Sequence, residues 1–452
     1  MTLLHPRSRR EFLSMGCRAL SAVGAAAAFG RAGLITARAQ TTGDYKALVC
    51  IFLFGGNDSN NLLVPNDSST YPTYKSIRQN LAIPQASLVG IHDAASNANY
   101  GLHPSFAPIA PLYNTSNRLA IMMNVGTLLQ PVPRASNGLP QLNSVPLPLN
   151  LYSHADQQSE WQNAYPQGGA TTGWAGRLAD KVAATSSGVV PPAITLAGNT
   201  LQLIGQTTQP SSVNTSNFGL IAPASDPGAT ALQGLLSLSS GVTLVQAAQN
   251  SLSGAISVAQ AVNAALAGAV SIGVTFPNSD IGSQLGQVAK LIQVRSSLGA
   301  SRQIFFCSQG GYDTHSNQLQ QQVTLYANLA NALNAFDQAM TALSVQDSVT
   351  AFTESDFSRT LQPNGNAGTD HGWGSHALVL GGAVNGGALY GTYPTLALSG
   401  PDDSGNRGTW VPSTSEDQYL AALAKWFGLV QTDMDYVFPN LKSFQYQTPA
   451  FI

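Results

Sequence analysis

The stretch KALVCIFLF at residues 46–54 decides the fold class, because it is a continuous apolar run that ends at Gly55 and Gly56. A strand that is apolar at every position is buried on both faces, which is typical of a parallel sheet with helices on both sides. Similar runs predict buried strands at residues 118–125, 193–197, 303–307 and 349–353, and a weaker candidate at 377–380. The chain is therefore predicted to be an α/β protein.

Helical patterns lie between and after these strands. Residues 318–343 carry apolar side chains at positions 319, 323, 326, 329, 333, 336 and 340, which is helical spacing. This helix joins the predicted strands at 303–307 and 349–353, so the three segments are predicted to form a crossover unit between parallel strands. A second helix is predicted from Glu416 to Phe427, packed back onto the core.

Charged residues are rare in this chain. Only 9% of its 452 residues are Asp, Glu, Lys or Arg, against about 25% in typical proteins. The apolar fraction of 44% is ordinary, so Ser, Thr, Asn, Gln and Gly supply the polarity, which is typical of an exported protein. The net charge of −2 provides no basic face and excludes nucleic acid as an expected partner.

The N-terminal segment predicts export. It contains SRREFL at residues 8–13, a weakly apolar run at 19–29 and an A-x-A site at 37–39, the features of a twin-arginine signal cleaved before Gln40. The twin-arginine translocase is then a partner during export, and the protein is expected in the periplasm or outside the cell. The apolar run is shorter than the roughly 20 residues a bilayer requires, so no stable membrane span is expected.

One domain is predicted over residues 40–452, with a low-charge insertion at about 200–280. No charged residue lies between Asp226 and Asp280. We interpret this stretch as helices or loops that cover one face of the sheet; a surface that contacts lipid or a partner is the alternative.

The sequence leaves the state of two of its three cysteines open. Cys17 lies in the signal, where the Leu of a lipoprotein box is missing, so lipidation is not expected. Cys50 and Cys307 lie in predicted strands and are either buried thiols, the reading we favour, or a disulfide between neighbouring strands.

Candidate metal ligands follow the predicted strands, in glycine-rich loops. Open α/β sheets place ligand sites at the carboxyl ends of their strands, and Asp and His are usual ligands of divalent ions. The candidates are Asp58 in GGNDSNN, Asp313 and His315 in GGYDTH, and Asp370, His371 and His376 in TDHGWGSH. A single Asp after a strand is more often a turn former or helix cap, but six such residues predict a metal site. Zn²⁺ is the expected ion, with Mn²⁺, Fe and Ca²⁺ as alternatives.

Several of these motifs resemble the exported bacterial family called domain of unknown function 1501, which is related to the alkaline phosphatase and sulfatase superfamily. The resemblance rests on GGNDSNNLLVP at 55–65, YSHAD at 152–156, GGYDTH at 310–315, ESDFSR at 354–359 and GTDHGWGSH at 368–376. It implies a three-layer α/β/α fold with a mostly parallel central sheet, like that of alkaline phosphatase. It also implies two metal ions, one held by Asp58, Asp370 and His371, the other by Asp313, His315 and His376.

The resemblance further implies a nucleophile. Ser153 is the best-placed candidate, because it precedes a plausible helix whose positive N-terminus favours an anion and an ionised alcohol. The alternative is an N-cap with no chemistry. His154 is expected to be a ligand or a transition-state donor. Arg359 is expected to hold a substrate anion or to form a structural ion pair with Glu354 or Asp356.

Together these features predict an exported metal-dependent hydrolase of a small anionic substrate, a phosphate ester or related ester. Sulfatase chemistry is disfavoured, because the C/S-x-P-x-R signature is only approached by PVPR at 131–134. The alternative is a secreted or surface-assembly protein that keeps the fold without catalysis.

Overall fold

The computed structural model describes residues 45–165, 167–183, 188, 190–213, 227–238 and 241–452. The predicted twin-arginine segment, including Cys17, lies outside the described residues.

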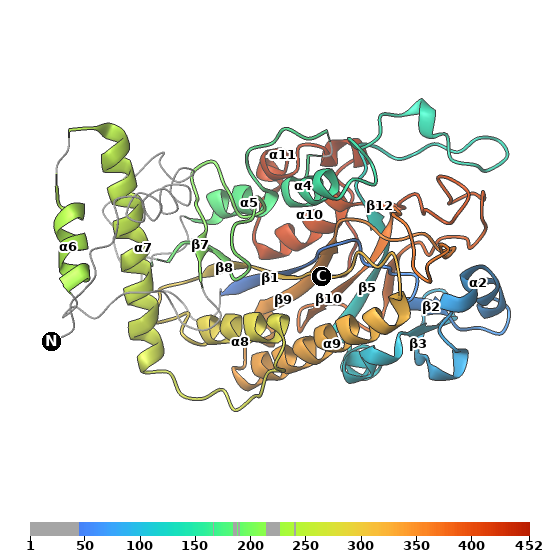
Figure 1. Ribbon diagram of the computed structural model, residues 1–452, viewed down its shortest axis with the longest axis horizontal. Coiled ribbons are helices and arrows are strands. Elements are labelled where there is room, and N and C mark those ends of the chain that lie inside the picture. Colours follow the sequence, from blue (N-terminus) through green and yellow to red (C-terminus); the bar gives the residue numbers. More distant parts are fainter. Residues whose placement is uncertain (1–44, 166, 184–187, 189, 214–226, 239–240) are drawn as a thin grey trace, which may run out of the picture.

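A mixed, mostly parallel sheet forms the centre of the molecule (Figure 1), with strand order β11-β5-β10-β9-β1-β8-β6-β7 and β12 paired to β5. Its strands are β1 (Lys46–Leu53), β5 (Leu119–Gly126), β6 (Ala193–Thr195), β7 (Ser211–Ser212), β8 (Arg302–Gln309), β9 (Val349–Ser355), β10 (Ser375–Gly381), β11 (Leu389–Gly391) and β12 (Thr414–Ser415). All six predicted strands are confirmed. Strand β10 runs antiparallel to both of its neighbours, β5 and β9.

Strand β1 shows why its sequence is apolar throughout. It pairs in parallel with β8 on one side and β9 on the other. Val49 and Ile51 belong to one hydrophobic core, and Leu48 and Phe52 belong to a second core on the opposite face. Because each face of the strand contributes to a different core, no position is left for a polar side chain.

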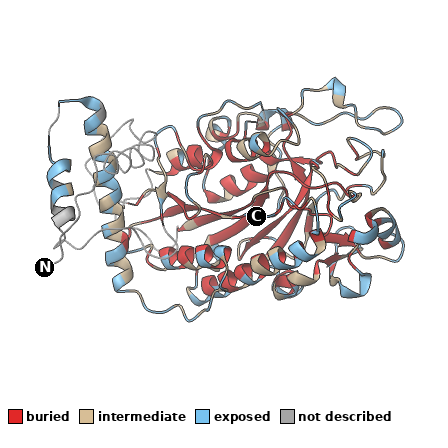
Figure 2. Ribbon diagram, in the orientation of Figure 1, coloured by how far each residue is buried: buried red, intermediate tan, exposed pale blue. Residues whose placement is uncertain are grey.

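Helices cover both faces of the sheet and make three layers (Figure 1). The first core is built with α8 (Asp280–Gln293) and α9 (Gln318–Ala342), and the second with α5 (Trp174–Val182), α10 (Glu416–Phe427) and α11 (Met434–Val437). Helix α4 (His154–Asn163) lies beside α5. The predicted helices at 318–343 and 416–427 are confirmed. Figure 2 shows the buried residues concentrated in the sheet and the inner faces of these helices.

A second, smaller sheet is antiparallel and has the order β2-β4-β3. Its strands are β2 (Leu63–Pro65), β3 (Val89–Asp93) and β4 (Ala98–Leu102), with α2 (Tyr71–Arg78) and α3 (Ala110–Asn114) nearby in the chain. The 3₁₀ helices are η1 (Gln79–Leu81), η2 (Gln85–Ser87), η3 (Pro104–Ile109), η4 (Leu142–Ser144), η6 (Gln346–Ser348), η7 (Gln431–Asp433) and η8 (Leu441–Phe444).

The two strand cysteines are free, buried thiols. Cys50 belongs to the core on one face of the sheet and Cys307 to the core on the other. Side chains on opposite faces of a sheet point away from each other, so a disulfide between them cannot form. The preferred interpretation is confirmed, and the disulfide alternative is wrong.

The uncharged stretch forms α6 (Pro227–Leu236) and α7 (Thr243–Ala267). Both lie at one end of the molecule (Figure 1), and residues around Val262 near the end of α7 pack against the core. The prediction of helices is confirmed, and the later part of the stretch, from Val258 to Phe276, packs against the core on the α8 and α9 side of the sheet. Leu235 and Leu238 are each 58% exposed.

Among the described residues, no helix has the length and apolar character needed to cross a bilayer.

Because Glu160 of α4 is a buried acid, we expect the stability of the protein to depend on pH. Glu160 is 1% exposed, and burial raises its pKa to about 9 from the usual value near 4.5. Below pH 4.5 the acid is protonated in both folded and unfolded chains. Between pH 4.5 and 9 the unfolded chain loses this proton and the folded chain keeps it, so stability falls as pH rises, with a limiting slope of about 1.4 kcal/mol per pH unit. We expect Glu160→Gln to flatten this loss, measured by urea unfolding at pH 5 to 9. An unchanged slope in the variant would contradict the assignment.

Candidate metal centre

The polar loops predicted as ligand sources meet at the carboxyl ends of β1, β8 and β9, as expected for an α/β sheet. Gly55, directly after β1, makes this approach possible. Its φ is +114°, and a Cβ at this position would lie 2.4 Å from the backbone nitrogen of Asp313 in the loop after β8. Only glycine combines this backbone conformation with so close an approach of two loops.

Three side chains converge at this edge, one from the start of α4, one from the loop after β8 and one from the loop between β9 and β10. One ligand atom from each of His154, Asp313 and His371 lies within 4.8 Å of the other two, which makes them the one such group of three in the part of the chain that the structure describes. The Nε2 atoms of His154 and His371 lie 3.4 and 3.5 Å from Asp313 Oδ1. Two ligands about 2.1 Å from one tetrahedral ion are roughly 3.4 Å apart, so these spacings suit a single ion.

The outer nitrogen of each histidine is held by an oxygen atom. His154 Nδ1 lies 2.7 Å from Asp356 Oδ2, and His371 Nδ1 lies 2.7 Å from the carbonyl oxygen of Tyr152. A carbonyl can only accept, so His371 carries its proton on Nδ1 and presents a lone pair on Nε2. Metal-binding histidines are usually oriented by such oxygen partners.

Asp356 is itself fixed in the interior. The side chain is buried, and it accepts hydrogen bonds from the backbone nitrogen of Gly55 at 3.1 Å and from Gln158 Nε2 at 2.7 Å. Its hydrogen bond with His154 raises the pKa of that histidine, whereas burial lowers the pKa of His371.

An unpartnered atom supports a cation at this point. The Nε2 atom of His154 is buried and has no hydrogen-bond partner within the described residues, although Asp313 Oδ1 is 3.4 Å away. When the neutral imidazole donates its Nδ1 proton to Asp356, its Nε2 lone pair faces the Asp313 carboxylate, and a cation between the two atoms stabilises this arrangement. The donor set of two imidazoles and one carboxylate is that of many catalytic zinc sites.

His315 is a fourth donor beside this group. Its Nε2 lies 3.0 Å from Asp313 Oδ1 and 3.1 Å from Nε2 of His371. On its other side, Nδ1 lies 3.4 Å from Asp370 Oδ1. A small rotation of the imidazole would therefore add a third nitrogen to the candidate ligands.

Arg359 is the buried arginine that contacts this centre. Its buried guanidinium donates from Nη1 to Asp313 Oδ1 at 2.6 Å and from Nη2 to the carbonyl oxygen of Thr369 at 2.7 Å. Burial raises the pKa of Asp313, but the hydrogen bond and charge of Arg359 outweigh burial and hold the pKa below its usual value. The expected ion pair of Arg359 with Glu354 or Asp356 is replaced by this pair with Asp313.

A backbone bridge sets Arg359 and His371 side by side. The two residues face each other in an isolated antiparallel bridge, with Gly372 donating to the Ser358 carbonyl oxygen at 2.8 Å. This bridge ties the loop after β9 to the loop before β10, and it places an imidazole and a guanidinium at the same centre.

Two predicted ligands, Asp58 and His376, lie outside the group of His154, Asp313 and His371. Asp58 is buried in an ion pair with Arg78 of α2, and it also accepts from Gln318 Nε2 at 2.6 Å. His376 is buried on β10, where its Nδ1 accepts from the backbone nitrogen of Asn124 at 3.1 Å, and burial lowers its pKa to about 3. The predicted grouping of Asp58 with Asp370 and His371, and of His376 with Asp313 and His315, is not the arrangement in the structure.

Asp370 lies next to the centre rather than in it. It pairs with Arg407 and accepts from Asn364 Nδ2 at 3.3 Å. Burial raises the pKa of Asp370, but Arg407 and Asn364 outweigh burial and hold the pKa below its usual value. Its carboxylate contacts the centre through His315.

Ser153 occupies the N-cap position of α4, as the sequence indicates. Its hydroxyl does not cap the helix and instead donates to Asp156 Oδ2 at 2.6 Å. The residue before it, Tyr152, has a φ of 76°, a conformation that is rare outside glycine and that aims its carbonyl oxygen at His371. The sequence reasoning missed Tyr152 and the orienting role of Asp356. For Asp356, the position directly after β9 was the one feature of the sequence that could have indicated a role at the site.

The orienting role of Asp356 predicts a change in metal affinity. Asp356→Asn removes the charge behind His154 and keeps the shape of the side chain. We expect divalent metal affinity to fall about 10–100-fold, measured by competition with a chelator of known affinity. Asp347→Asn, at an exposed carboxylate on η6, is the matched control. Equal affinities for the two variants would rule out this role.

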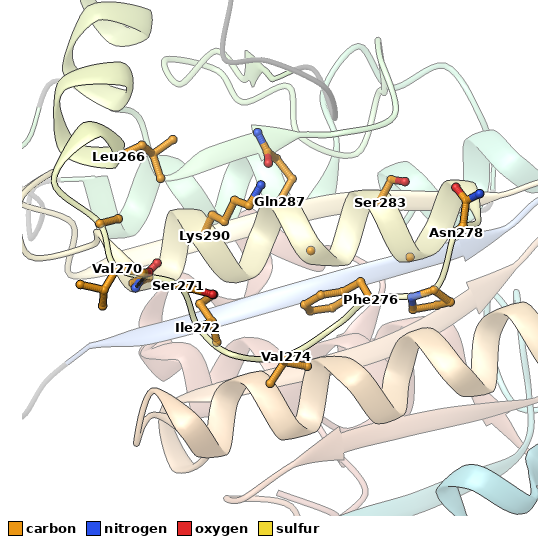
Figure 3. A pocket seen from close by; sticks show the side chains of 15 residues that line it. Leu266, Val270, Ser271, Ile272, Val274, Phe276, Asn278, Ser283, Gln287 and Lys290 are labelled. Atoms are coloured by element: carbon orange, nitrogen blue, oxygen red, sulfur yellow. Dashed lines mark hydrogen bonds between the residues drawn. The ribbon is translucent and has the colours of Figure 1, made fainter.

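A larger groove of about 710 Å³ lies elsewhere, between the end of α7 and α8 (Figure 3). Val270, Ile272, Phe276 and Lys290 line it, and none of the predicted site residues does. The groove and the metal centre are therefore separate features.

Comparisons with known proteins are consistent with the motifs. The chain is similar over 90% of its length, and over 77% of the other chain, to the solved structure described as "Crystal structure of Ps i-CgsB in complex with k-i-k-neocarrahexaose", with 8% identity and a TM-score of 0.36. No curated protein matches the chain. A family model described as "Protein of unknown function (DUF1501)" matches residues 45–404. The loops that build the centre after β1, β8 and β9 all fall within this match, and the chain belongs to the DUF1501 family.

Proposed function

We propose that this protein is an exported metal-dependent hydrolase that acts on a phosphate ester or related anionic ester at the centre of His154, Asp313 and His371. The observation that carries the proposal is the convergence of two oriented imidazole Nε2 atoms on one carboxylate oxygen, at separations that suit one ion. Export rests on the twin-arginine motif, and the likeness to the alkaline phosphatase fold rests on the mostly parallel sheet with its site at the strand ends.

The donor set favours Zn²⁺, because imidazole and carboxylate ligands together suit zinc better than Ca²⁺, which prefers oxygen ligands alone. One such group exists in the described part of the chain, so we propose one ion per centre. A bound ion would polarise the ester oxygen and favour ionisation of a water or alcohol. His315 is the residue best placed to extend the ligand set.

The chain's own groups around the centre suit an anionic ester. Arg359 is fully buried, and Asp313 and Thr369 hold its guanidinium in place, so it contributes a fixed positive charge behind Asp313 rather than a direct contact with the ester. Ser153 stands at the N-terminus of α4, whose unpaired backbone N–H groups favour negative charge. The Asp156 carboxylate accepts the Ser153 proton in its hydrogen bond and would hold the hydroxyl in place as the candidate nucleophile.

Metal analysis and activity on the same purified protein test the proposal. We expect close to one divalent ion per chain and hydrolysis of nitrophenyl phosphate mono- or diesters that is lost with a chelator and restored by Zn²⁺ or Mn²⁺. A protein that binds less than one ion after reconstitution, and hydrolyses none of these esters, would refute the hydrolase. Ser153→Ala tests the nucleophile separately: turnover is lost if the hydroxyl attacks the ester, whereas only stability changes if its one role is the hydrogen bond to Asp156.

One observation favours a second candidate, a non-catalytic secreted or surface-assembly protein. Helices α6 and α7 carry no charge; Leu235 of α6, Leu238 just after α6 and Val245 of α7 are exposed to solvent, which is typical of a contact surface. If the metal binds with the expected stoichiometry but no ester is hydrolysed, this second function gains and the centre is structural.

A further inference from the structure

Strands β9 and β10 separate toward the carboxyl end of β9, the end of the sheet that carries the metal centre. Their backbone pairing ends at Phe352 and Val379, although β9 continues to Ser355 and β10 begins at Ser375. The space between the unpaired ends contains a small cavity, with about 10 Å³ of room for the centre of a water molecule. Asn57 from the loop after β1, Glu354 from β9 and Ser375 from β10 line it.

Each of these three side chains leaves one polar atom without a partner. Asn57 Nδ2, Glu354 Oε2 and Ser375 Oγ are buried and make no hydrogen bond within the described residues. Asn57 and Glu354 are each 1% exposed, and Ser375 is 4% exposed. An unsatisfied buried group costs about 1–3 kcal/mol, so three around one cavity indicate a common ligand.

In two of these side chains, the second polar atom of the amide or carboxyl group already forms a hydrogen bond. Asn57 Oδ1 accepts from Tyr326 Oη at 2.8 Å, and Glu354 Oε1 accepts from Gln202 Nε2 at 3.1 Å. These bonds hold both groups in place and leave Nδ2 of Asn57 as the free donor. Burial raises the pKa of Glu354 and outweighs the opposite effect of Cys50, Gln202 and Trp174 nearby, which favours the protonated acid as a second donor.

We propose that this cavity binds one water molecule, hydrogen-bonded to Asn57 Nδ2, Glu354 Oε2 and Ser375 Oγ. The room is that of one water, and a buried water needs two to four polar partners. A metal cation is disfavoured, because the amide of Asn57 presents N–H groups that would face its charge. A dry void is disfavoured as well, because dry cavities have apolar linings.

The water links the loop after β1 with β9 and β10 at a point where β9 and β10 are not paired by backbone hydrogen bonds. The backbone nitrogen of Asn57 donates to Ser355 Oγ at 2.8 Å, and the neighbouring Gly55 donates to Asp356, which orients His154. The bound water therefore supports the loop after β1 and the end of β9, from which the metal centre is built. This inference does not depend on whether the centre is catalytic.

A crystal structure of the purified protein at about 1.5 Å or better tests the site directly. We expect one ordered peak within about 3.2 Å of the three atoms, both in the natural protein and in Glu354→Gln, which keeps the shape and polarity of the side chain. An empty cavity would overturn the proposal. A peak that refines as a metal ion, with short contacts to oxygen atoms only, would overturn it too.

Two substitutions at one position give an independent measurement. Ser375→Ala removes one partner and leaves room for the water, whereas Ser375→Val fills the space and leaves Asn57 and Glu354 unsatisfied. We expect the Tm of the valine variant to lie below that of the alanine variant by roughly 2–4 °C or more. A valine variant at least as stable as the alanine variant would show that a well-packed dry site suffices. If the valine variant does not fold, the crystal structures of the natural and alanine forms still decide the question.

Discussion

Replacement of Asp313 or of His371 by Ala is expected to abolish tight binding of a divalent ion, because each change removes one of three converging ligands. The loss should exceed the roughly 10–100-fold expected when only an orienting partner such as Asp356 is changed. Any ester hydrolysis at the centre should disappear with the metal. The measurement is the number of ions bound per chain and the dissociation constant, each determined by titration of the metal-free protein.

The matched control is His92→Ala, which removes an exposed histidine whose side chain pairs with Asn99 on the small sheet. This variant should bind the metal as the natural protein does. Asp58→Asn offers a sharper contrast: it leaves the buried Arg78 without its charged partner and should lower stability, but the folded variant should bind the same number of ions at the centre. If Asp58→Asn abolishes metal binding while Asp313→Ala retains it, the assignment of the centre is wrong.

Replacement of Arg78 by Met should destabilise the whole protein strongly. The side chains of Arg78 and Asp58 are both fully buried, and they form an ion pair. Removal of the arginine leaves the Asp58 carboxylate in the interior without its compensating charge, which typically costs about 3–5 kcal/mol. Urea or guanidinium unfolding of the purified variant at neutral pH measures the change in free energy of unfolding.

The double variant Arg78→Met with Asp58→Asn separates the charge effect from packing. It removes both charges, and the Asn side chain can still accept from Gln318, which lies 2.6 Å from Asp58 Oδ2. Much of the lost stability should therefore return. A double variant that is as unstable as Arg78→Met alone would show that the arginine acts through packing and its bonds to the carbonyl oxygens of Thr360 and Leu361.

The strands, the long helices and the ligand-bearing loops could be predicted from local patterns. The run at 47–54 is apolar because β1 contributes to a core on each face of the sheet, and this requirement is visible in eight consecutive residues. The loops after β1 and β8 are glycine-rich because they approach each other closely, as Gly55 and Asp313 show. Both features depend on neighbours in the chain or on the general geometry of parallel sheets.

The choice among candidate ligands could not be predicted in the same way. Asp58 follows a strand just as Asp313 does, and only the position of Arg78 on α2 commits Asp58 to a buried ion pair. His376 follows His371 by five residues, but it lies on the strand that runs antiparallel to its neighbours, and its imidazole is buried against Tyr393. The residues around Asp58 and His376 do not differ in kind from those around Asp313 and His371, so the local sequence does not show which of them belong to the centre.

Local sequence thus determined which segments form the sheet and which loops lie at its carboxyl edge, because burial on two faces and tight turns leave a mark on adjacent residues. Tertiary structure alone decided that His154, Asp313 and His371 converge, because their orientation comes from distant groups. Asp356 is 202 positions from His154, and the Tyr152 carbonyl is 219 positions from His371. A hydrogen bond between residues so far apart depends on the packed fold, and no pattern of adjacent residues encodes it.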